Sequence, residues 1–321
     1  MAAMTSSFEQ AYSIDSPTGA TLSVRHQPAV GPQRGILLLS HGLAEHSVRY
    51  VAFARSMAAA GLAVYAHDHR GHGKTVAADA PIGRFSATDG RRKVLADVMA
   101  VRAHALEAHP GLPVILFGHS MGGLIAWNSV ISNSAAFDAV AVWNSNFQAG
   151  AAGRAAQAIL AVEKAMKGSD VPSGILPRLT FEAWGKAVPN RRTLFDWLSH
   201  DPTVVDAYIA DPLCGFDASV SLWQDLFGLI YRGGHPSNWS GIDRNLPIHL
   251  VGGTEDPATN GGKAVDRMAH DLRKAGFRDV TLALISGFRH ETLNEIGAAQ
   301  PIEAFRSWVD RVLAHPRRQE R

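Results

Sequence analysis

Continuous apolar runs and amphipathic segments alternate along the first half of the chain. Four runs are typical of strands that are covered on both faces: residues 35–39, 62–66, 114–117 and 139–143. The segments between them carry apolar residues at helical spacing: residues 51–60, 94–106 and 124–131. Strand and helix in strict alternation predict a parallel sheet with helices on both faces.

The alternation stops at about residue 146 and resumes after residue 243. The intervening stretch is rich in Ala, Trp and Leu, contains no buried-strand run, and is broken by Pro172, Pro177, Pro189, Pro202 and Pro212. Two further strands follow at residues 247–251 and 280–285, and a last amphipathic helix spans residues 302–312. We therefore assign residues 1–145 and 244–321 to an α/β core and residues 146–243 to an inserted helical lid. Residues 21–25 alternate between apolar and polar, which predicts a half-exposed strand at the edge of the sheet.

Composition excludes several classes of protein. The 321 residues are 46% hydrophobic and 19% charged with a formal net charge of +2, which is ordinary for a globular enzyme and offers no basic surface for nucleic acid. No apolar run approaches the roughly 20 residues of a membrane span, and residues 1–13 lack the features of a signal peptide. Cys214 is the only cysteine, so an internal disulfide is excluded. These features predict a cytoplasmic protein.

One pentapeptide indicates nucleophilic chemistry. Gly118-His119-Ser120-Met121-Gly122 comes directly after an apolar run and directly before a helical pattern. A Gly-x-Ser-x-Gly turn between a strand and a helix is the nucleophile elbow, in which both flanking positions are too crowded for a side chain. We predict that Ser120 is a nucleophile at the edge of the sheet.

An acid and a base follow at two later strand ends. Asp256 comes after the strand at residues 247–251, and His290 comes after the strand at residues 280–285. Ser, Asp and His in this order are expected of an α/β-hydrolase, and loops at one edge of a parallel sheet can bring them together. Glu255 is the rival acid, but Pro257 favours an extended conformation that projects Asp256 from the loop.

Two backbone amides are candidates for the oxyanion hole. Met121 follows the nucleophile at the expected start of a helix, and its N–H points to where negative charge develops. The second donor is expected in the loop after the strand at residues 35–39. In that loop His41-Gly42 ends the strand, which makes the amide of Leu43 the candidate.

Three motifs together carry a family resemblance. His41-Gly-Leu-Ala-Glu-His-Ser-Val-Arg-Tyr50, His67-Asp-His-Arg-Gly-His-Gly73 and Gly118-His-Ser-Met-Gly122 resemble the monoglyceride lipase and lysophospholipase branch of the α/β-hydrolases, which is often described as serine aminopeptidase-like. Asp211-Pro-Leu-Cys-Gly-Phe216 is similar to the lid of bacterial members. The resemblance implies an α/β-hydrolase fold with a mostly parallel eight-stranded sheet, helices on both faces and an inserted lid.

The same resemblance implies a serine carboxylic-ester hydrolase that acts on acyl-glycerol lipids through an acyl-enzyme intermediate, with Ser120, Asp256 and His290 as the triad. An esterase on shorter or aromatic esters, an aminopeptidase or amidase, and a non-catalytic binding module of the same fold remain alternatives. No cofactor is expected. A small lipid or ester is the expected partner, with transient contact between the lid and lipid aggregates or a membrane surface.

Aromatic residues are the candidates for the substrate pocket. We expect the following to line a tunnel for an acyl chain: His119, Trp143, Trp184, Trp197, Trp223 and Phe227. Two positions depart from the family's pattern. Ala44 stands where many relatives carry glycine, so the oxyanion loop is expected to differ in shape, and the bulky Trp143 is expected to narrow the acyl pocket.

The histidine-rich stretch invites a metal-dependent alternative. His67, His69 and His72 superficially resemble the ligands of metallo-hydrolases, but that motif requires an aspartate where Gly71 stands. We therefore expect no catalytic metal. The histidines are expected to hydrogen-bond the loops around the site, and Asp68 and Arg70 to pair as structural charges.

Overall fold

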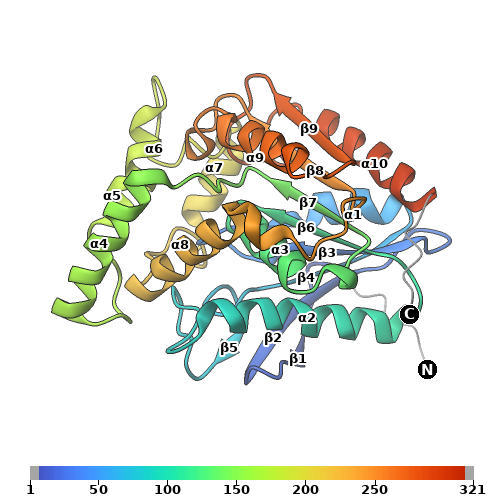
Figure 1. Ribbon diagram of the computed structural model, residues 1–321, viewed down its shortest axis with the longest axis horizontal. Helices are drawn as coiled ribbons and strands as arrows, with labels where there is room; N and C mark the ends of the chain where they lie inside the picture. Colours follow the sequence, from blue (N-terminus) through green and yellow to red (C-terminus); the bar gives the residue numbers. More distant parts are fainter. Residues whose placement is uncertain (1–6, 315–321) are drawn as a thin grey trace.

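The computed structural model describes residues 7–314 of the 321 (Figure 1). Residues 1–6, part of the segment considered for a signal peptide, lie outside the described residues. Within the described part of the chain, none of the helices combines the length and the apolar character needed to cross a bilayer.

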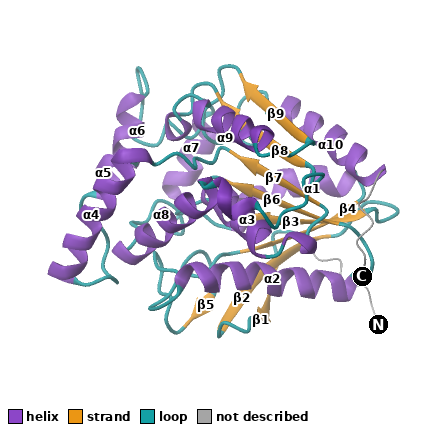
Figure 2. Cartoon of the chain, in the orientation of Figure 1, coloured by secondary structure: helices purple, strands orange, loops and turns teal. Residues whose placement is uncertain are grey.

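A single twisted sheet forms the centre of the molecule (Figure 2). Its strands are β1 (Ala11–Asp15), β2 (Ala20–Gln27), β3 (Gly35–Ser40), β4 (Leu62–His67), β5 (Val76–Ala77), β6 (Val114–His119), β7 (Ala139–Trp143), β8 (Ile248–Gly253) and β9 (Val280–Ile285). The spatial order is β1-β2-β4-β3-β6-β7-β8-β9. From β4 to β9 every neighbouring pair in this order is parallel, whereas β2 is antiparallel to both β1 and β4. The predicted mostly parallel sheet is confirmed, and the two-residue β5, which pairs with β2, adds a ninth strand to the predicted eight.

Helices cover both faces of this sheet. One face carries α1 (Val51–Ala59) and α10 (Ala299–Ala314), and the other carries α2 (Gly90–Ala108), α3 (Met121–Ser132), α8 (Val220–Gly234) and α9 (Lys263–Lys274). Four short 3₁₀ helices lie in the connections: Ser47–Tyr50, Ser134–Ala136, Pro236–Trp239 and Pro257–Thr259. Alternation along β7 shows how one strand serves both layers. Val140 and Val142 pack with α3, and Trp143 packs toward α1 and α10.

The strand at residues 21–25 differs from its prediction. β2 is not at the edge, because β1 pairs with it along its outer side. Thr21 is exposed, but the other two polar residues of the alternation, Ser23 and Arg25, are covered: Arg25 is 4% exposed and donates hydrogen bonds to the carbonyl of Glu9 at 2.6 Å and to Ser47 Oγ at 3.0 Å. Polar alternation therefore marked a strand correctly, but its polar side faces protein hydrogen-bond acceptors instead of water.

The insertion between β7 and β8 supplies five α-helices. In sequence before α8 come α4 (Gly150–Lys167), α5 (Leu176–Leu179), α6 (Phe181–Ala187) and α7 (Pro202–Ala210), of which α4, α5 and α6 project from one end of the molecule (Figure 1). In contrast, α8 packs along α3, where Trp127 Nε1 donates to the carbonyl of Gly233 at 3.0 Å and Asn128 Nδ2 donates to that of Leu229 at 2.9 Å. We infer that the lid proper ends before α8, and that α8 belongs to the helical layer of the core, short of the expected boundary at residue 243.

Candidate active site

Ser120 occupies a strained turn between β6 and α3. Its φ of 55° and ψ of −120° lie in a region that non-glycine residues rarely adopt. A Cβ added to Gly118 would lie 2.1 Å from the carbonyl oxygen of Gly122, and one added to Gly122 would lie 2.0 Å from that of Ser40. Both glycines are therefore required by close backbone packing, which is the local reason that this pentapeptide can present Ser120 at the carboxyl edge of the sheet.

The structure brings Ser120, His290 and Asp256 into one hydrogen-bonded chain. Ser120 Oγ lies 2.9 Å from His290 Nε2, and His290 Nδ1 lies 3.0 Å from both carboxylate oxygens of Asp256. His290 and Asp256 are buried at 3% and 0% exposure, whereas Ser120 is partly accessible. With Nδ1 donating to Asp256, Nε2 is left to accept the serine proton.

Asp256 is held by donors from three sides. Its Oδ2 accepts from Thr259 Oγ1 at 2.8 Å and Asn144 Nδ2 at 3.1 Å, and its Oδ1 accepts from the N–H of Ala258 at 2.9 Å. Burial by itself raises the pKa of Asp256, but the facing His290 and these hydrogen bonds outweigh burial and hold the pKa below its ordinary value. The carboxylate is therefore charged and fixed in orientation.

Glu255, the rival acid, points elsewhere. Its side chain is 55% exposed and lies 3.3 Å from His200 Nε2 at the surface. Asp256 is the residue that faces His290.

The proposed oxyanion donors belong to Leu43 and Met121, which line the same cavity as Ser120. Met121 is the first residue of α3, so its N–H has no acceptor within the helix, and both Met121 and Leu43 line the cavity above Ser120. The neighbouring amide of Gly42 is engaged by Glu45 Oε1 at 2.5 Å. Ala44 has a φ of 55°, the left-handed region that favours glycine, so the backbone at this departure from the family's pattern keeps a conformation suited to glycine.

We call residues 41–46, which follow β3 and contain Leu43, the oxyanion loop. Arg49 joins this loop to the loop that carries His290. Its NH1 lies 2.6 Å from Glu45 Oε2 and 2.6 Å from Glu291 Oε1, and its guanidinium lies 4.9 Å from the ring centre of Tyr208. Burial by itself lowers the pKa of Arg49, but Glu291 and Glu45 outweigh it and raise the pKa. Sequence reasoning assigned no role to these residues, although Glu45 and Arg49 stand in the first motif that carried the resemblance.

The lid also contacts the oxyanion loop directly. The carbonyl of Ala44 accepts the Tyr208 hydroxyl at 2.9 Å and the N–H of Gly215 at 2.9 Å. Burial raises the pKa of Tyr208, so the hydroxyl remains a donor. The segment from α7 to α8 therefore fixes the loop that holds Leu43.

His119 is the last residue of β6 and contacts the backbone of His290. Its Nε2 is 3.0 Å from the carbonyl of His290, and its Nδ1 is 3.8 Å from Glu45 Oε1. Burial by itself lowers the pKa of His119, but Glu45 outweighs burial and raises it. His119 also lines the cavity, as expected.

A cavity of about 420 Å³ runs from Ser120 under the lid. This volume is within the roughly 300–1,000 Å³ of small-molecule sites. Its wall is mainly apolar, and four of the predicted aromatic residues contribute to it: Trp184, Trp197, Trp223 and Phe227. At the start of α4 the wall is made of small residues, the N-cap Ala149 and, within the helix, Ala152, Gly153 and Ala156.

Trp143 does not line this cavity, so the prediction that it narrows the acyl pocket is wrong. Its side chain is fully buried on the opposite side of the sheet, 5.3 Å from the ring of Phe117, and its Nε1 lies 3.1 Å from His249 Nδ1. The physical reason is the two-residue alternation of β7, which turns Trp143 toward α10. Its neighbour Asn144 reaches the cavity and Asp256 instead.

The histidine-rich loop that contains His67, His69 and His72 is buried and hydrogen-bonds to the neighbouring loop that contains His41. His69 donates its N–H to His41 Nε2 at 2.9 Å, and burial lowers the pKa of His67 to about 4 and that of His72 to about 3. Within residues 7–314, the His, Cys, Asp and Glu side chains whose donor atoms lie close enough to share a metal ion are His46, Asp211 and Cys214. His67, His69 and His72 do not belong to this group.

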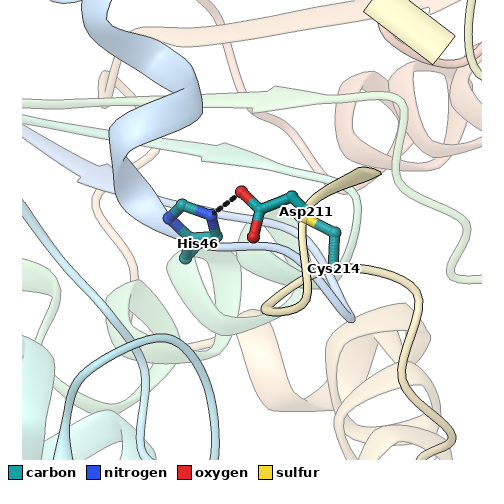
Figure 3. A group of neighbouring side chains, drawn as sticks. All are labelled: His46, Asp211 and Cys214. Carbon is teal, nitrogen blue, oxygen red and sulfur yellow. Dashed lines mark hydrogen bonds and ion pairs between the residues drawn. The ribbon is translucent and has the colours of Figure 1, made fainter. Parts of the chain in front are cut away.

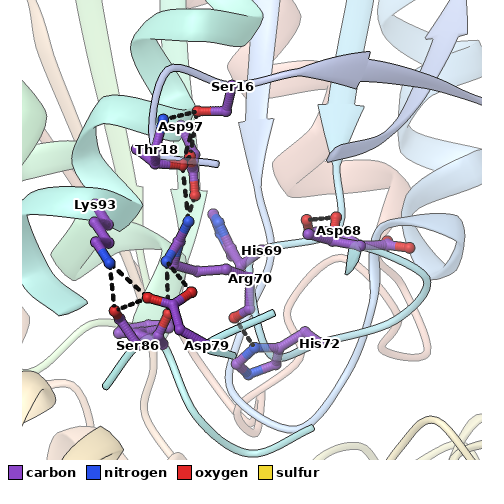
Figure 4. A network of polar contacts seen from close by, with 12 residues as sticks. Ser16, Thr18, Asp68, His69, Arg70, His72, Asp79, Ser86, Lys93 and Asp97 are labelled. Atoms are coloured by element: carbon purple, nitrogen blue, oxygen red, sulfur yellow. Dashed lines mark hydrogen bonds and ion pairs between the residues drawn. The ribbon is translucent and has the colours of Figure 1, made fainter. Parts of the chain in front are cut away.

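The expected ion pair between Asp68 and Arg70 does not form. Figure 4 shows Arg70 turned toward Asp97, with Nε 2.7 Å from Asp97 Oδ2, and Asp68 on the other side of the loop. Asp68 accepts from the N–H groups of Ser47 and Lys74, both at 2.9 Å. Asp68 therefore satisfies the backbone of the loop, while Arg70 ties this loop to α2 through Asp97.

Comparison with known proteins places this geometry in a family. The profile of the family described as "Serine aminopeptidase, S33" matches residues 31–297. The chain belongs to this family. It is 31% identical to the monoglyceride lipase of Homo sapiens, over 87% of this chain and 82% of that protein. It is 29% identical to the monoacylglycerol lipase of Mycolicibacterium smegmatis, over 86% of this chain and 88% of that protein.

Solved structures agree on the fold. A thermostable carboxyl esterase from Bacillus coagulans, in complex with glycerol, superposes on this S33 hydrolase with a TM-score of 0.85, at 22% identity, over 95% of this chain and 98% of that one. The predicted α/β-hydrolase fold and the monoglyceride lipase branch are thus confirmed.

Proposed function

We propose that this S33 hydrolase is a serine carboxylic-ester hydrolase that cleaves acyl-glycerol lipids, monoacylglycerols or lysophospholipids. The observation that carries the proposal is the continuous hydrogen-bonded chain from Ser120 through His290 to Asp256, which opens into a mainly apolar cavity. The names of the relatives support the substrate class.

The geometry supports a two-step reaction. His290 Nε2 takes the proton of Ser120 as its Oγ attacks the ester carbonyl, and the amides of Met121 and Leu43 stabilise the negative charge on the carbonyl oxygen. His290 returns the proton to the leaving alcohol, and a fatty-acyl ester of Ser120 remains. Water activated by His290 then releases the fatty acid. Asp256 keeps the imidazole in the required tautomer throughout.

The charged groups of the site disfavour an aminopeptidase. An aminopeptidase needs an acidic side chain that is available to bind the free amino group of its substrate. The two carboxylates that line the cavity, Glu45 and Glu291, are both paired with Arg49 at 2.6 Å. Burial raises the pKa of a carboxyl, but Arg49 and His119 hold the pKa of Glu45 well below its ordinary value, so its charge is already satisfied.

The outer surface of the lid supports contact with lipid aggregates. Large apolar side chains are exposed there: Val162, Met166, Ile175 and Leu179. Leu179, which is 55% exposed, also lines the cavity, so this exposed surface reaches the cavity wall at Leu179. Lys164 and Lys167 lie on the same helix as Met166 and favour anionic interfaces. We include transient binding of this surface to lipid in the proposal.

A substrate panel tests the activity. Monoacylglycerols and p-nitrophenyl esters of increasing chain length are compared with lysophospholipids and amino-acyl p-nitroanilides. The expected result is the highest kcat/KM on medium- or long-chain monoacylglycerols and negligible cleavage of the anilides. Preference for acetyl or butyryl esters would support the short-chain esterase, and preferential anilide cleavage would support the peptidase.

Ser120→Ala is the matched control. It removes one oxygen atom, so the fold is expected to remain intact while turnover of every ester in the panel is nearly abolished. A fluorophosphonate probe is expected to label the native protein at Ser120 and to leave Ser120→Ala unlabelled. Undiminished labelling of the variant would place the nucleophile elsewhere, and an unreactive native protein would support the non-catalytic binding module.

A further inference from the structure

Three side chains with different metal-binding atoms converge beside the oxyanion loop. His46, Asp211 and Cys214 each offer one such atom, and these atoms all lie within 4.8 Å of one another. Figure 3 shows them approaching from two segments, His46 from the loop after β3 and the other two from the loop between α7 and α8. We call these residues the His46–Asp211–Cys214 cluster.

The set of donor atoms suits a particular class of ion. An imidazole nitrogen, a carboxylate oxygen and a sulfur are the ligand types of Zn²⁺, and three protein ligands leave a fourth tetrahedral position for water. Zinc bonds of about 2.0–2.3 Å place the ligand atoms of a tetrahedral site roughly 3.3–3.8 Å apart. His46 Nε2 and Asp211 Oδ2 are 2.8 Å apart, joined by a hydrogen bond that an ion would replace. The His46 and Asp211 atoms would have to move apart, and the remaining separations, all within 4.8 Å, would have to settle near this range.

The surroundings are built to hold the three ligands. His46 is 4% exposed and Cys214 9%, whereas the side chain of Asp211, at 31%, leaves a path from solvent. Asp211 Oδ1 accepts the N–H of Leu213 at 2.8 Å, which orients the carboxylate. Tyr208 and Trp197 pack in the same apolar cluster as Cys214 and limit the space around the sulfur.

The local charge also favours a cation. Arg49 is the nearby positive group, and it is paired with both Glu45 and Glu291. Together with Asp211, three carboxylates face one guanidinium in this part of the fold. A bound ion would replace the thiol proton, so binding is expected to release a proton and to weaken at acid pH.

We propose that the His46–Asp211–Cys214 cluster binds one divalent cation of the zinc class. The ion would join the oxyanion loop to the lid at a second point, because Gly215, next to Cys214, already donates its N–H to the carbonyl of Ala44. The site stands apart from the Ser120–His290–Asp256 chain and requires no metal chemistry in ester cleavage. Its test therefore does not depend on the proposed hydrolase activity.

Metal titration of the reduced full-length protein tests the site. Zn²⁺ is competed against a chromophoric chelator, and Co²⁺ is added separately to seek the sulfur-to-metal charge-transfer absorption that only thiolate coordination produces. We expect one high-affinity Zn²⁺ per chain, a thiolate band with Co²⁺, and no competition from Mg²⁺ or Ca²⁺. Absence of stoichiometric Zn²⁺ binding, or a Co²⁺ spectrum without the thiolate band, would overturn the proposal.

Variants separate this site from the other histidines. Cys214→Ser, His46→Gln and Asp211→Asn each remove or weaken one ligand with little change in volume. Since loss of an outer-shell partner already weakens metal binding by about 10–100-fold, loss of a ligand is expected to weaken it at least that much. His270→Gln, at an exposed position of α9, is the matched control and should bind like the native protein. Equal affinity in Cys214→Ser, with a native circular dichroism spectrum, would assign the ion to other residues and refute the site.

Discussion

Replacing Asn144 by glycine tests how Asp256 is held. The side-chain Nδ2 of Asn144 donates to Asp256 Oδ2 at 3.1 Å, and the side-chain Oδ1 of Asn144 accepts the Thr292 hydroxyl at 2.8 Å. Glycine is preferred over alanine because Asn144 has a φ of 50°, which alanine tolerates poorly. The variant thus removes two hydrogen bonds without adding backbone strain.

The expected loss follows from the burial of Asp256. A hydrogen bond to a charged group contributes about 1.5–3 kcal/mol. Without this bond the carboxylate is no longer held in line with His290 Nδ1, and if a cost of this size falls on the orientation of the imidazole, kcat falls by about 10- to 100-fold. Fewer donors concentrate negative charge on the carboxylate and favour the imidazolium. The acid limb of the kcat/KM profile is therefore expected to move to higher pH.

Two further variants separate charge from positioning. Thr259→Val removes the other side-chain donor to Asp256 Oδ2, and Thr292→Val removes only the contact between Asn144 and the loop of His290. Hydrolysis of a p-nitrophenyl ester is measured from about pH 5 to pH 9. The acid limb is expected to move in Asn144→Gly and Thr259→Val and to stay in place in Thr292→Val. Full activity of Asn144→Gly, or an equal shift in Thr292→Val, would refute the electrostatic reasoning.

Three other substitutions have expected outcomes of different kinds. Burial raises the pKa of Asp225 from 3.8 to about 6, so its contribution to stability is present below about pH 4 and is lost as the pH rises through 6. In urea unfolding, the free energy of unfolding of Asp225→Asn should therefore exceed that of the native protein by up to about 3 kcal/mol at pH 8, but not at pH 4. Equal gains at both pH values would contradict this. Ala44→Gly removes left-handed strain of about 1–2 kcal/mol at an entropic cost of about 0.5–1, so its free energy of unfolding should rise slightly, and a clear fall would show that Ala44 is unstrained. Ala156→Phe fills the cavity wall on α4 and should lower kcat/KM for long acyl chains while short esters are cleaved as before; a uniform loss would instead indicate a damaged fold.

The sequence by itself determined the order of the elements and the residues that meet at the site. Buried runs that alternate with amphipathic segments are enough to predict a parallel sheet, because helices cover both faces of such a sheet and its strands are therefore apolar throughout. Since the carboxyl ends of parallel strands share one edge, residues as distant as Ser120 and His290 could be expected to meet there, and the structure brings them within hydrogen-bonding distance. The crowded turn around Ser120 requires glycine at both flanking positions, so Gly118 and Gly122 already mark this turn in the sequence.

Tertiary structure decided what local pattern does not encode. The direction of Trp143 depends on the phase of β7, so one residue of register separates the acyl pocket from the opposite core. Arg49 pairs with Glu291, which comes from a distant loop. Asp68 and Arg70 bind the backbone donors and the carboxylate that the fold places beside them. Arg25 is buried because β1 pairs along the outer side of its strand. Long side chains pair with whatever charge the fold brings near, because hydrogen bonds and ion pairs act over a few ångströms of space and not over sequence distance.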